Sequence, residues 1–194
     1  MCSSDLEGRR CLDAGASTGG FTEVLLDRGA REIVAADVGY GQLAWSLRSD
    51  DRVIVMERTN VRELTADAIG GPVDLVVADL SFISLATVLP ALTACASAQA
   101  DIVPMVKPQF EVGKDRVGAG GVVSDPELRA DAVLTVARRA TDLGWHAVDV
   151  TASPLPGPSG NVEYFLRLRA TTDEPLEGEA LVAAVGRAVA GGPQ

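Results

Sequence analysis

The sequence predicts an α/β fold: a Rossmann-like, seven-stranded sheet with helices on both faces and a terminal antiparallel β-hairpin. Short β-branched runs alternate with longer helical stretches along most of the chain, which is typical of βαβ units and a parallel sheet. Towards the carboxyl end, two strand-like runs at 147–152 and 162–168 are joined by a turn-rich segment. This pairing indicates a hairpin, so the last strand is expected to run antiparallel.

The remaining elements follow from hydrophobic periodicity and from cap signals. The other strands are expected at 9–13, 32–38, 53–57, 73–79 and 101–107, and helices are expected at 20–27, 42–48, 85–96, 126–144 and 175–190, with a short turn near 62–69. The long helix has the clearest boundaries, because Asp125 suits the N-cap, Pro126 suits the first helical position and Gly144 suits the stop. The glycine-rich segment 112–122 is expected to be a loop.

Length and composition indicate one domain spanning residues 1–194. Hydrophobic residues make up 47% of the chain and charged residues 23%, which is ordinary for a soluble globular protein. No apolar run is long enough to span a bilayer, and the amino terminus lacks the apolar stretch of a signal peptide. We therefore expect a cytoplasmic protein with no membrane partner.

The cysteines and the single histidine give no metal signature. The three cysteines lack the spacing of a metal site, and His146 has no partner motif nearby. Cys11 and Cys95 lie in apolar segments and are predicted to be small core residues. His146 is expected at the start of a strand without a chemical role, so we expect no metal.

The net charge of −10 argues against RNA being held by the charge of this domain alone, since phosphate contacts dominate non-specific affinity for nucleic acids. Two kinds of enzyme remain: one that acts on RNA gripped elsewhere, and one that acts on a smaller substrate. The chain has two lysines, Lys107 and Lys114, against fifteen arginines. A lysine is therefore rare enough here to suggest a role that arginine cannot fill.

A glycine-rich loop follows the first strand, in the run from Asp13 to Thr22. Its glycines, Gly15, Gly19 and Gly20, permit a tight turn and a close approach of the backbone to a ligand. Their spacing differs from the G-x-G-x-x-G of dehydrogenases, and the loop suits a ligand with a carboxylate and an ammonium. A purely structural strand-to-helix turn is the alternative.

Two further residues are candidates for binding the same ligand. Asp37 ends the second strand, where a carboxylate can accept both hydrogen bonds of a ribose diol; alternatively it is the N-cap of the next helix. Asn60 follows the third strand and could face an adenine, or it could equally cap the next turn.

Three polar residues at strand ends are candidates for catalysis. Asp79 closes the fourth strand, Lys107 closes the fifth and Glu163 opens the last. With an antiparallel last strand, all three are expected to converge beside the glycine loop. A lysine with a lowered pKa could take a proton from a weakly acidic hydroxyl, or as a cation it could stabilise the developing alkoxide. The alternative for Lys107 is a surface lysine.

A seven-stranded sheet with a terminal hairpin is also found in methyltransferases, and two methyl-transfer chemistries have sequence signatures that are missing here. Methylation of base amino groups typically uses Asp/Asn-Pro-Pro-aromatic at the fourth strand, but Asp79 is followed by Leu-Ser-Phe. Methylation of a cytosine carbon needs a nucleophilic cysteine at the sheet edge. Neither Cys11 nor Cys95 is placed for that attack.

Seven strands with a terminal hairpin are the layout of class I methyltransferases, and five motifs carry a closer resemblance. The segments 11–22, 36–43, 79–84, 106–111 and 160–165 resemble the TlyA family, which belongs to the FtsJ-like ribose methyltransferases, and the resemblance covers nearly the whole chain. It is closest to mycobacterial and actinobacterial members. It implies cytidine 2′-O-methylation of ribosomal RNA in both subunits and sensitivity to capreomycin-type antibiotics.

The resemblance also assigns site residues. It implies S-adenosylmethionine as cofactor, ribosomal RNA or ribosomal subunits as partner, and Asp79, Lys107 and Glu163 as the last three members of a Lys-Asp-Lys-Glu tetrad. The cofactor is expected to contact Asp13, Gly15, Ser17, Thr18, Gly19, Gly20, Asp37, Asn60 and Asp79. The family also carries a haemolysin label, but the sequence offers no amphipathic membrane helix of the kind that this label requires.

Two departures from the family pattern qualify the expectation. Family members begin with a small RNA-binding domain, and the first tetrad lysine precedes the glycine loop, but residues 1–10 contain no lysine. We therefore expect residues 1–194 to fold yet to methylate ribosomal RNA weakly or not at all by themselves. The alternatives are a small-molecule O-methyltransferase and a non-catalytic or haemolysin-like cofactor-binding module.

Overall fold

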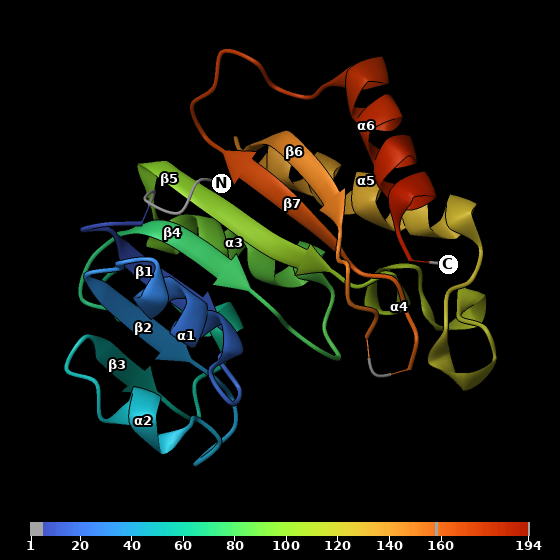
Figure 1. Cartoon of the computed structure of the whole chain (residues 1–194). Coiled ribbons are helices and arrows are strands. Elements are labelled where there is room, and N and C mark those ends of the chain that lie inside the picture. Colours follow the sequence, from blue (N-terminus) through green and yellow to red (C-terminus); the bar gives the residue numbers. More distant parts are fainter. Residues whose placement is uncertain (1–5, 158, 194) are drawn as a thin grey trace. The chain divides into compact units, whose positions relative to one another are not determined.

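A computed structural model describes residues 6–157 and 159–193. Its described part contains a mixed sheet of seven strands in the order β3-β2-β1-β4-β5-β7-β6 (Figure 1). The strands are β1 (Arg10–Ala14), β2 (Glu32–Ala36), β3 (Val53–Met56), β4 (Val73–Ala78), β5 (Ala96–Val106), β6 (His146–Ala152) and β7 (Tyr164–Arg169). The predicted seven-stranded sheet with a terminal antiparallel hairpin is therefore confirmed.

Helices connect most of these strands. The α-helices are α1 (Gly20–Asp27), α2 (Trp45–Arg48), α3 (Leu85–Cys95), α4 (Pro108–Glu111), α5 (Pro126–Asp142) and α6 (Gly178–Gly191). Three short 3₁₀ helices complete the described elements: η1 (Val61–Glu63), η2 (Lys114–Arg116) and η3 (Ala119–Gly121). The last two lie in the segment that the sequence predicts to be a loop.

The observed boundaries differ most from the predicted ones at β5, and by three residues at the start of α2 and of α6. β5 begins at Ala96, directly after the last residue of α3, whereas the sequence predicts a strand from 101. The added residues 96–100 contain no β-branched side chain, so their extended conformation has no local signal. α2 starts at Trp45 rather than at 42, after Gly41 has adopted a left-handed φ of 70°.

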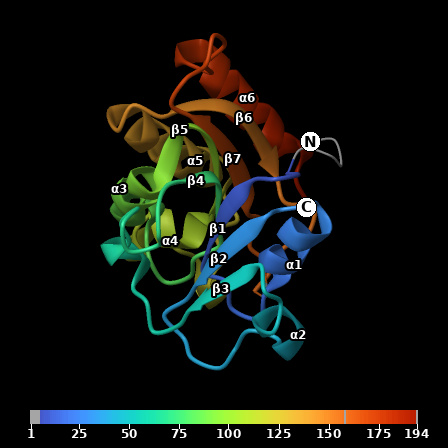
Figure 2. The ribbon, with the colours of Figure 1, turned by 90° about the vertical axis from the view of Figure 1, so that its left-hand side faces the viewer.

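The chain forms two compact units, and the first contains residues up to 80 together with 90–102. β1 lies between β2 and β4 in this unit and pairs with both in parallel (Figure 2). All five residues of β1 are buried, as expected of a parallel strand covered on both faces. β2 in turn pairs in parallel with β3.

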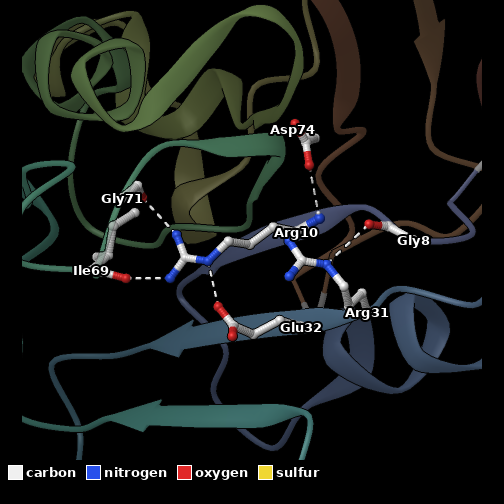
Figure 3. A network of polar contacts seen from close by, with 7 residues as sticks. All are labelled: Gly8, Arg10, Arg31, Glu32, Ile69, Gly71 and Asp74. Carbon is white, nitrogen blue, oxygen red and sulfur yellow. Dashed lines mark hydrogen bonds and ion pairs between the residues drawn. The ribbon is translucent and has the colours of Figure 1, made fainter.

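A buried arginine stabilises the amino end of β1 in the first unit (Figure 3). The Arg10 guanidinium donates to the Glu32 carboxylate and to the carbonyl oxygens of Ile69 and Gly71, and the Arg10 main-chain N–H donates to Asp74 at 3.0 Å. A buried charge is costly unless it is paired, and these contacts pair the charge of Arg10. They also fix the turn before β4 against β1.

The second unit contains residues 81–89 and those from 103 onward. β6 and β7 pair antiparallel, with Ala152 opposite Tyr164, and α6 packs against β6 and α5. The caps of α5 are as predicted: Asp125 accepts from the Glu127 N–H at 2.8 Å, Pro126 is the first helical residue, and Gly144 has a φ of 80°.

Candidate functional site

The glycine loop between β1 and α1 has a backbone that only small residues accommodate easily. Gly15 and Gly19 have left-handed φ values of 89° and 104°, a region that favours glycine. A Cβ on Gly15 would collide with the main-chain oxygen of Asp79, and one on Gly19 would collide with the Leu47 side chain. Ser17 is also left-handed, with a φ of 48°. The glycines are thus required by both conformation and space, while Gly20 begins α1 with open space around it.

Asp13 lies fully buried at the base of this loop. The Thr22 hydroxyl, also buried, donates to Oδ2 of Asp13 at 2.6 Å, whereas Oδ1 has no hydrogen-bond partner among the described residues. The pKa of Asp13 is raised to about 6, mainly by burial. The hydrogen bonds from Thr22 lower it, and the charges of Asp79 and Asp37 contribute to the rise. An unsatisfied buried carboxylate oxygen is costly, and it suits a cationic group of a ligand.

Asp37 connects the end of β2 to the glycine loop. Its Oδ2 accepts from the Ser17 N–H at 2.9 Å and its Oδ1 accepts from the Gly39 N–H at 2.6 Å. The alternative role as N-cap of the next helix is wrong, because α2 begins at Trp45 with Ala44 at the N-cap. Each carboxylate oxygen has a second lone pair, so Asp37 retains the capacity to accept from a diol.

A shallow pocket opens next to Asp37 in the first unit. Its lining residues come from the glycine loop, β2, β3 and the segment before α2: Ala16, Ser17, Ala35, Asp37, Gly39, Gln42, Leu43, Val55 and Glu57. The Thr18 carbonyl accepts from the Ala44 N–H at 3.1 Å. This bond ties the glycine loop to the start of α2, so two of the segments around the pocket are joined.

Asn60 caps η1. Its side-chain oxygen accepts from the Arg62 N–H at 3.2 Å and its amide donates to Glu63 at 2.9 Å. The capping alternative for Asn60 is therefore confirmed, and a contact with adenine stays a prediction.

Asp79 follows β4 in the first unit. Its main-chain N–H donates to the Ala14 carbonyl at 3.1 Å, and its carbonyl lies against Gly15. Its charge contributes to the raised pKa of Asp13. Asp13, Asp37 and Asp79 thus form one acidic group around the glycine loop.

Lys107 and Glu163 form an ion pair in the second unit. Nζ of Lys107 lies 3.3 Å from Oε1 of Glu163, and their side chains are 10% and 7% exposed. The alternative of a surface lysine is therefore wrong. Glu163 stands one residue before β7 rather than opening it, and its main-chain oxygen accepts from Ser153 N–H at 2.8 Å. Opposite charges so well shielded from water interact strongly.

Hydrogen bonds of Asn161 fix the chain just before Glu163. Buried Asn161 accepts from the Val123 N–H and donates to the Gly121 carbonyl, both at 2.9 Å. The Gly157 N–H donates to the Asn161 carbonyl at 2.8 Å, and a Cβ on Gly157 would lie 2.9 Å from Oε1 of Glu163. Gly157 therefore leaves the space that this carboxylate occupies.

Sequence reasoning did not single out Thr22, Asn161, Glu111 or Phe82. Thr22 and Glu111 end two of the recognised motifs, and Asn161 lies within a third, but no spacing rule predicts which carboxylate or main-chain group each contacts. Phe82 is 91% exposed with a left-handed φ of 65°, and its ring centroid lies 5.3 Å from that of Phe110. A non-glycine residue in this conformation is uncommon.

The cysteines and His146 show no sign of a catalytic or metal-binding role among the described residues. Cys11 and Cys95 are buried, and burial raises the pKa of their thiols to about 12 and about 11, so both are core residues as predicted. His146 begins β6. Within residues 6–157 and 159–193, no helix is long and apolar enough to cross a membrane, and no three His, Cys, Asp or Glu side chains are grouped to hold a metal ion.

Comparison with known proteins identifies the family. The model of the FtsJ-like methyltransferase family matches residues 3–170. The chain belongs to this family. It is 76% identical over 186 residues to a protein of Mycobacterium tuberculosis named 16S/23S rRNA (cytidine-2′-O)-methyltransferase TlyA, a match that covers 96% of this chain and 69% of that relative. The resemblance to the TlyA proteins is thereby confirmed.

Solved structures of other proteins agree with this assignment. A crystal structure from Lactococcus lactis, described as a hemolysin, is 38% identical with a TM-score of 0.84, over 92% of this chain and 88% of that one. An S-adenosylmethionine-dependent methyltransferase from Mesorhizobium loti is 13% identical with a TM-score of 0.61, over 85% of this chain and 92% of that one. This second likeness concerns the fold alone, and it confirms the predicted class I methyltransferase fold of the FtsJ-like chain.

Proposed function

We propose that this chain transfers a methyl group from S-adenosylmethionine to the ribose 2′-hydroxyl of cytidine in ribosomal RNA. The observation that carries the proposal is the shielded ion pair of Lys107 and Glu163 in an FtsJ-like methyltransferase. The pair keeps an ammonium shielded from bulk water. A shielded charge acts strongly on a nearby oxygen. The substrate class follows the name of the M. tuberculosis relative.

The residues around the glycine loop fit S-adenosylmethionine. When bound, it supplies a methyl group on a positively charged sulfur. We assign its amino-acid end to Asp13 and to the loop residues Gly15, Ser17, Thr18, Gly19 and Gly20. The unpartnered Oδ1 of Asp13 suits the ammonium, and the remaining lone pairs of Asp37 suit the ribose diol. Asp79 completes the proposed contacts, and Asn60 is the proposed contact on the adenine side.

Lys107, Glu163 and Asp79 are the proposed catalytic residues. A ribose hydroxyl is a weak acid, and negative charge develops on its oxygen as the proton leaves to solvent water. The bond from this oxygen to the methyl carbon forms as the bond from the methyl carbon to sulfur breaks. The carboxylate of Glu163 favours the ammonium form of Lys107, so we assign Lys107 to stabilising this charge rather than to taking up the proton. Electrostatic stabilisation of this kind contributes about a hundredfold to a thousandfold in rate.

The charge of residues 1–194 does not favour binding of RNA. The net charge of −10 opposes binding of phosphate, most strongly at low salt, where screening is weakest. We therefore expect residues 1–194 to bind ribosomal RNA weakly and to methylate it slowly by themselves. Ribosomal RNA as substrate would place the reaction in the cytoplasm.

A small-molecule O-methyltransferase is the second candidate, favoured by the same negative charge. Transfer of tritiated methyl groups separates the two. The acceptors are ribosomal subunits that lack the modification and a panel of catechols and phenols, each tested with residues 1–194 and with a fusion to the amino-terminal region of the M. tuberculosis relative. Labelled RNA, increased by the fusion, supports the proposal; labelled small molecules alone would favour the second candidate, and no transfer to either would indicate a non-catalytic module.

A further inference from the structure

Glu111, the last residue of α4, binds the start of α3 with both carboxylate oxygens. Oε2 accepts from the Ser84 hydroxyl at 2.6 Å and Oε1 accepts from the Leu85 N–H at 2.7 Å. Burial raises the pKa of Glu111, while these two hydrogen bonds act in the opposite direction. Leu85 is the first residue of α3, where main-chain N–H groups have no partner within the helix.

α4 connects this contact to Lys107. Lys107 is the N-cap of α4, and its carbonyl accepts from the Phe110 N–H at 2.9 Å. The Val112 N–H closes the turn on the Pro108 carbonyl at 3.0 Å. Lys107 and Glu111 are therefore the two ends of a single hydrogen-bonded turn, so a displacement of one end is transmitted to the other.

A second contact joins the same two segments. The rings of Phe82 and Phe110 lie 5.3 Å apart at 50°, a geometry that aromatic pairs favour. The segments 81–85 and 107–111 both belong to the second unit, and the polar and the aromatic contact together link them over more than twenty residues of sequence.

We propose that Glu111 is a positioning residue for methyl transfer. Its carboxylate fixes α4 to the start of α3 and so holds Lys107 where it pairs with Glu163. The inference rests on the proposed function of Lys107.

Local capping does not account for Glu111. Ser84 already caps the start of α3, since its hydroxyl oxygen accepts from the Ala86 N–H at 3.2 Å. A carboxylate from a distant segment has therefore been added to an end that is capped locally. Asp125 offers a matched control, because it caps α5 through the Glu127 N–H at 2.8 Å and lies outside the α4 turn.

The two lysines of the chain allow a test that does not depend on catalysis. Lys107 is buried and Lys114 is exposed, so Lys114 serves as an internal reference for an amine-reactive acylating reagent. The modified peptides are quantified by mass spectrometry. Glu111→Ala should raise the modification rate of Lys107 relative to Lys114 by about tenfold, because local opening becomes more frequent. Glu111→Gln, which keeps one acceptor oxygen, should give an intermediate ratio, and Asp125→Ala should leave the ratio unchanged.

The same variants are then assayed for methyl transfer to ribosomal subunits, fused to the amino-terminal region of the M. tuberculosis relative. Glu111→Ala should lower kcat by about tenfold or more, with KM for S-adenosylmethionine changed less than about twofold. Asp125→Ala should lower the thermal midpoint while keeping kcat. An unchanged lysine ratio in Glu111→Ala, or an equal loss of kcat in Asp125→Ala, would overturn the inference. A raised ratio together with an inactive wild-type fusion would refute the proposed function, while still showing that Glu111 holds Lys107 in place.

Discussion

The Lys107 ammonium lies 3.3 Å from the Glu163 carboxylate, and both side chains are almost fully shielded from solvent. A pair so placed is a poor source of stability, because desolvation of the two charges offsets their attraction. Removing one partner is costly, however, since it leaves the other charge buried without compensation. The pair therefore has separable effects on stability and on chemistry.

Lys107→Met tests this separation, because methionine keeps the aliphatic length and removes the ammonium. Loss of one partner of a buried pair costs about 3–5 kcal/mol, so the variant should unfold at lower denaturant concentration. It should also lose methyl transfer by at least about a hundredfold. The double variant Lys107→Met/Glu163→Gln should recover most of the stability and none of the activity. Recovery of activity along with stability would make Lys107 a structural residue only.

Asp37→Ala tests the proposed contact with the ribose of the cofactor. Hydrogen bonds to a charged acceptor contribute about 1.5–3 kcal/mol each, so losing them should weaken binding of S-adenosylmethionine by at least tenfold in calorimetry. Asp37 also accepts from the Ser17 N–H, so thermal unfolding of Asp37→Ala without cofactor serves as the control for the loop. Equal affinity of Asp37→Ala and the wild type would remove Asp37 from the cofactor site.

Asp13→Asn tests the buried carboxylate through its pH dependence. The pKa of Asp13 is raised from 3.8 to about 6, so the folded state holds the proton more tightly than the unfolded state. Ionisation therefore lowers stability as pH rises through this window, and the full cost is present above it. The asparagine variant lacks this cost. Its stability relative to the wild type should rise from about pH 4 to about pH 7 and then level off.

Thermal unfolding of the two proteins across this pH range measures the difference, and Glu111, whose pKa is also raised, contributes equally to both. Saturating S-adenosylmethionine should stabilise the wild type more than Asp13→Asn at neutral pH, since its ammonium would pair with the ionised carboxylate. Two parallel curves would show that Asp13 does not titrate in this window.

Gly157→Ala tests how closely Glu163 must be placed. The added Cβ would lie 2.9 Å from Oε1 of Glu163, so the carboxylate must move. Small misplacements at an active site lower the reaction rate strongly. We expect the rate of methyl transfer to fall by about tenfold, with little change in the free energy of unfolding. Gly186→Ala is the control, because Gly186 lies in α6 with open space around it and alanine favours a helix. Full activity in Gly157→Ala would show that Glu163 tolerates displacement.

The sequence predicts the strands well because they depend on local patterns. β1 and β4 are apolar runs, and the long helix α5 has apolar periodicity and cap residues. These signals do not depend on which elements lie beside them in space. The start of β5 at Ala96 has no such signal, because pairing within the sheet determines it. The same holds for the contacts of Glu111 and Asn161, whose partners lie 26 to 40 residues away. Asp37 shows the limit most clearly: its place at a strand end predicts a ligand role, but its bond to Ser17 appears only in the structure.

The nucleosides formed on ribosomal RNA test the central claim most directly. Ribosomal subunits that lack the modification are incubated with S-adenosylmethionine and either the wild type or Lys107→Met, each fused to the amino-terminal region of the M. tuberculosis relative. The RNA is then digested and analysed by mass spectrometry. We expect 2′-O-methylcytidine with the wild type and none above background with Lys107→Met. Methylation on a base, or equal 2′-O-methylcytidine from both proteins, would contradict the proposed function.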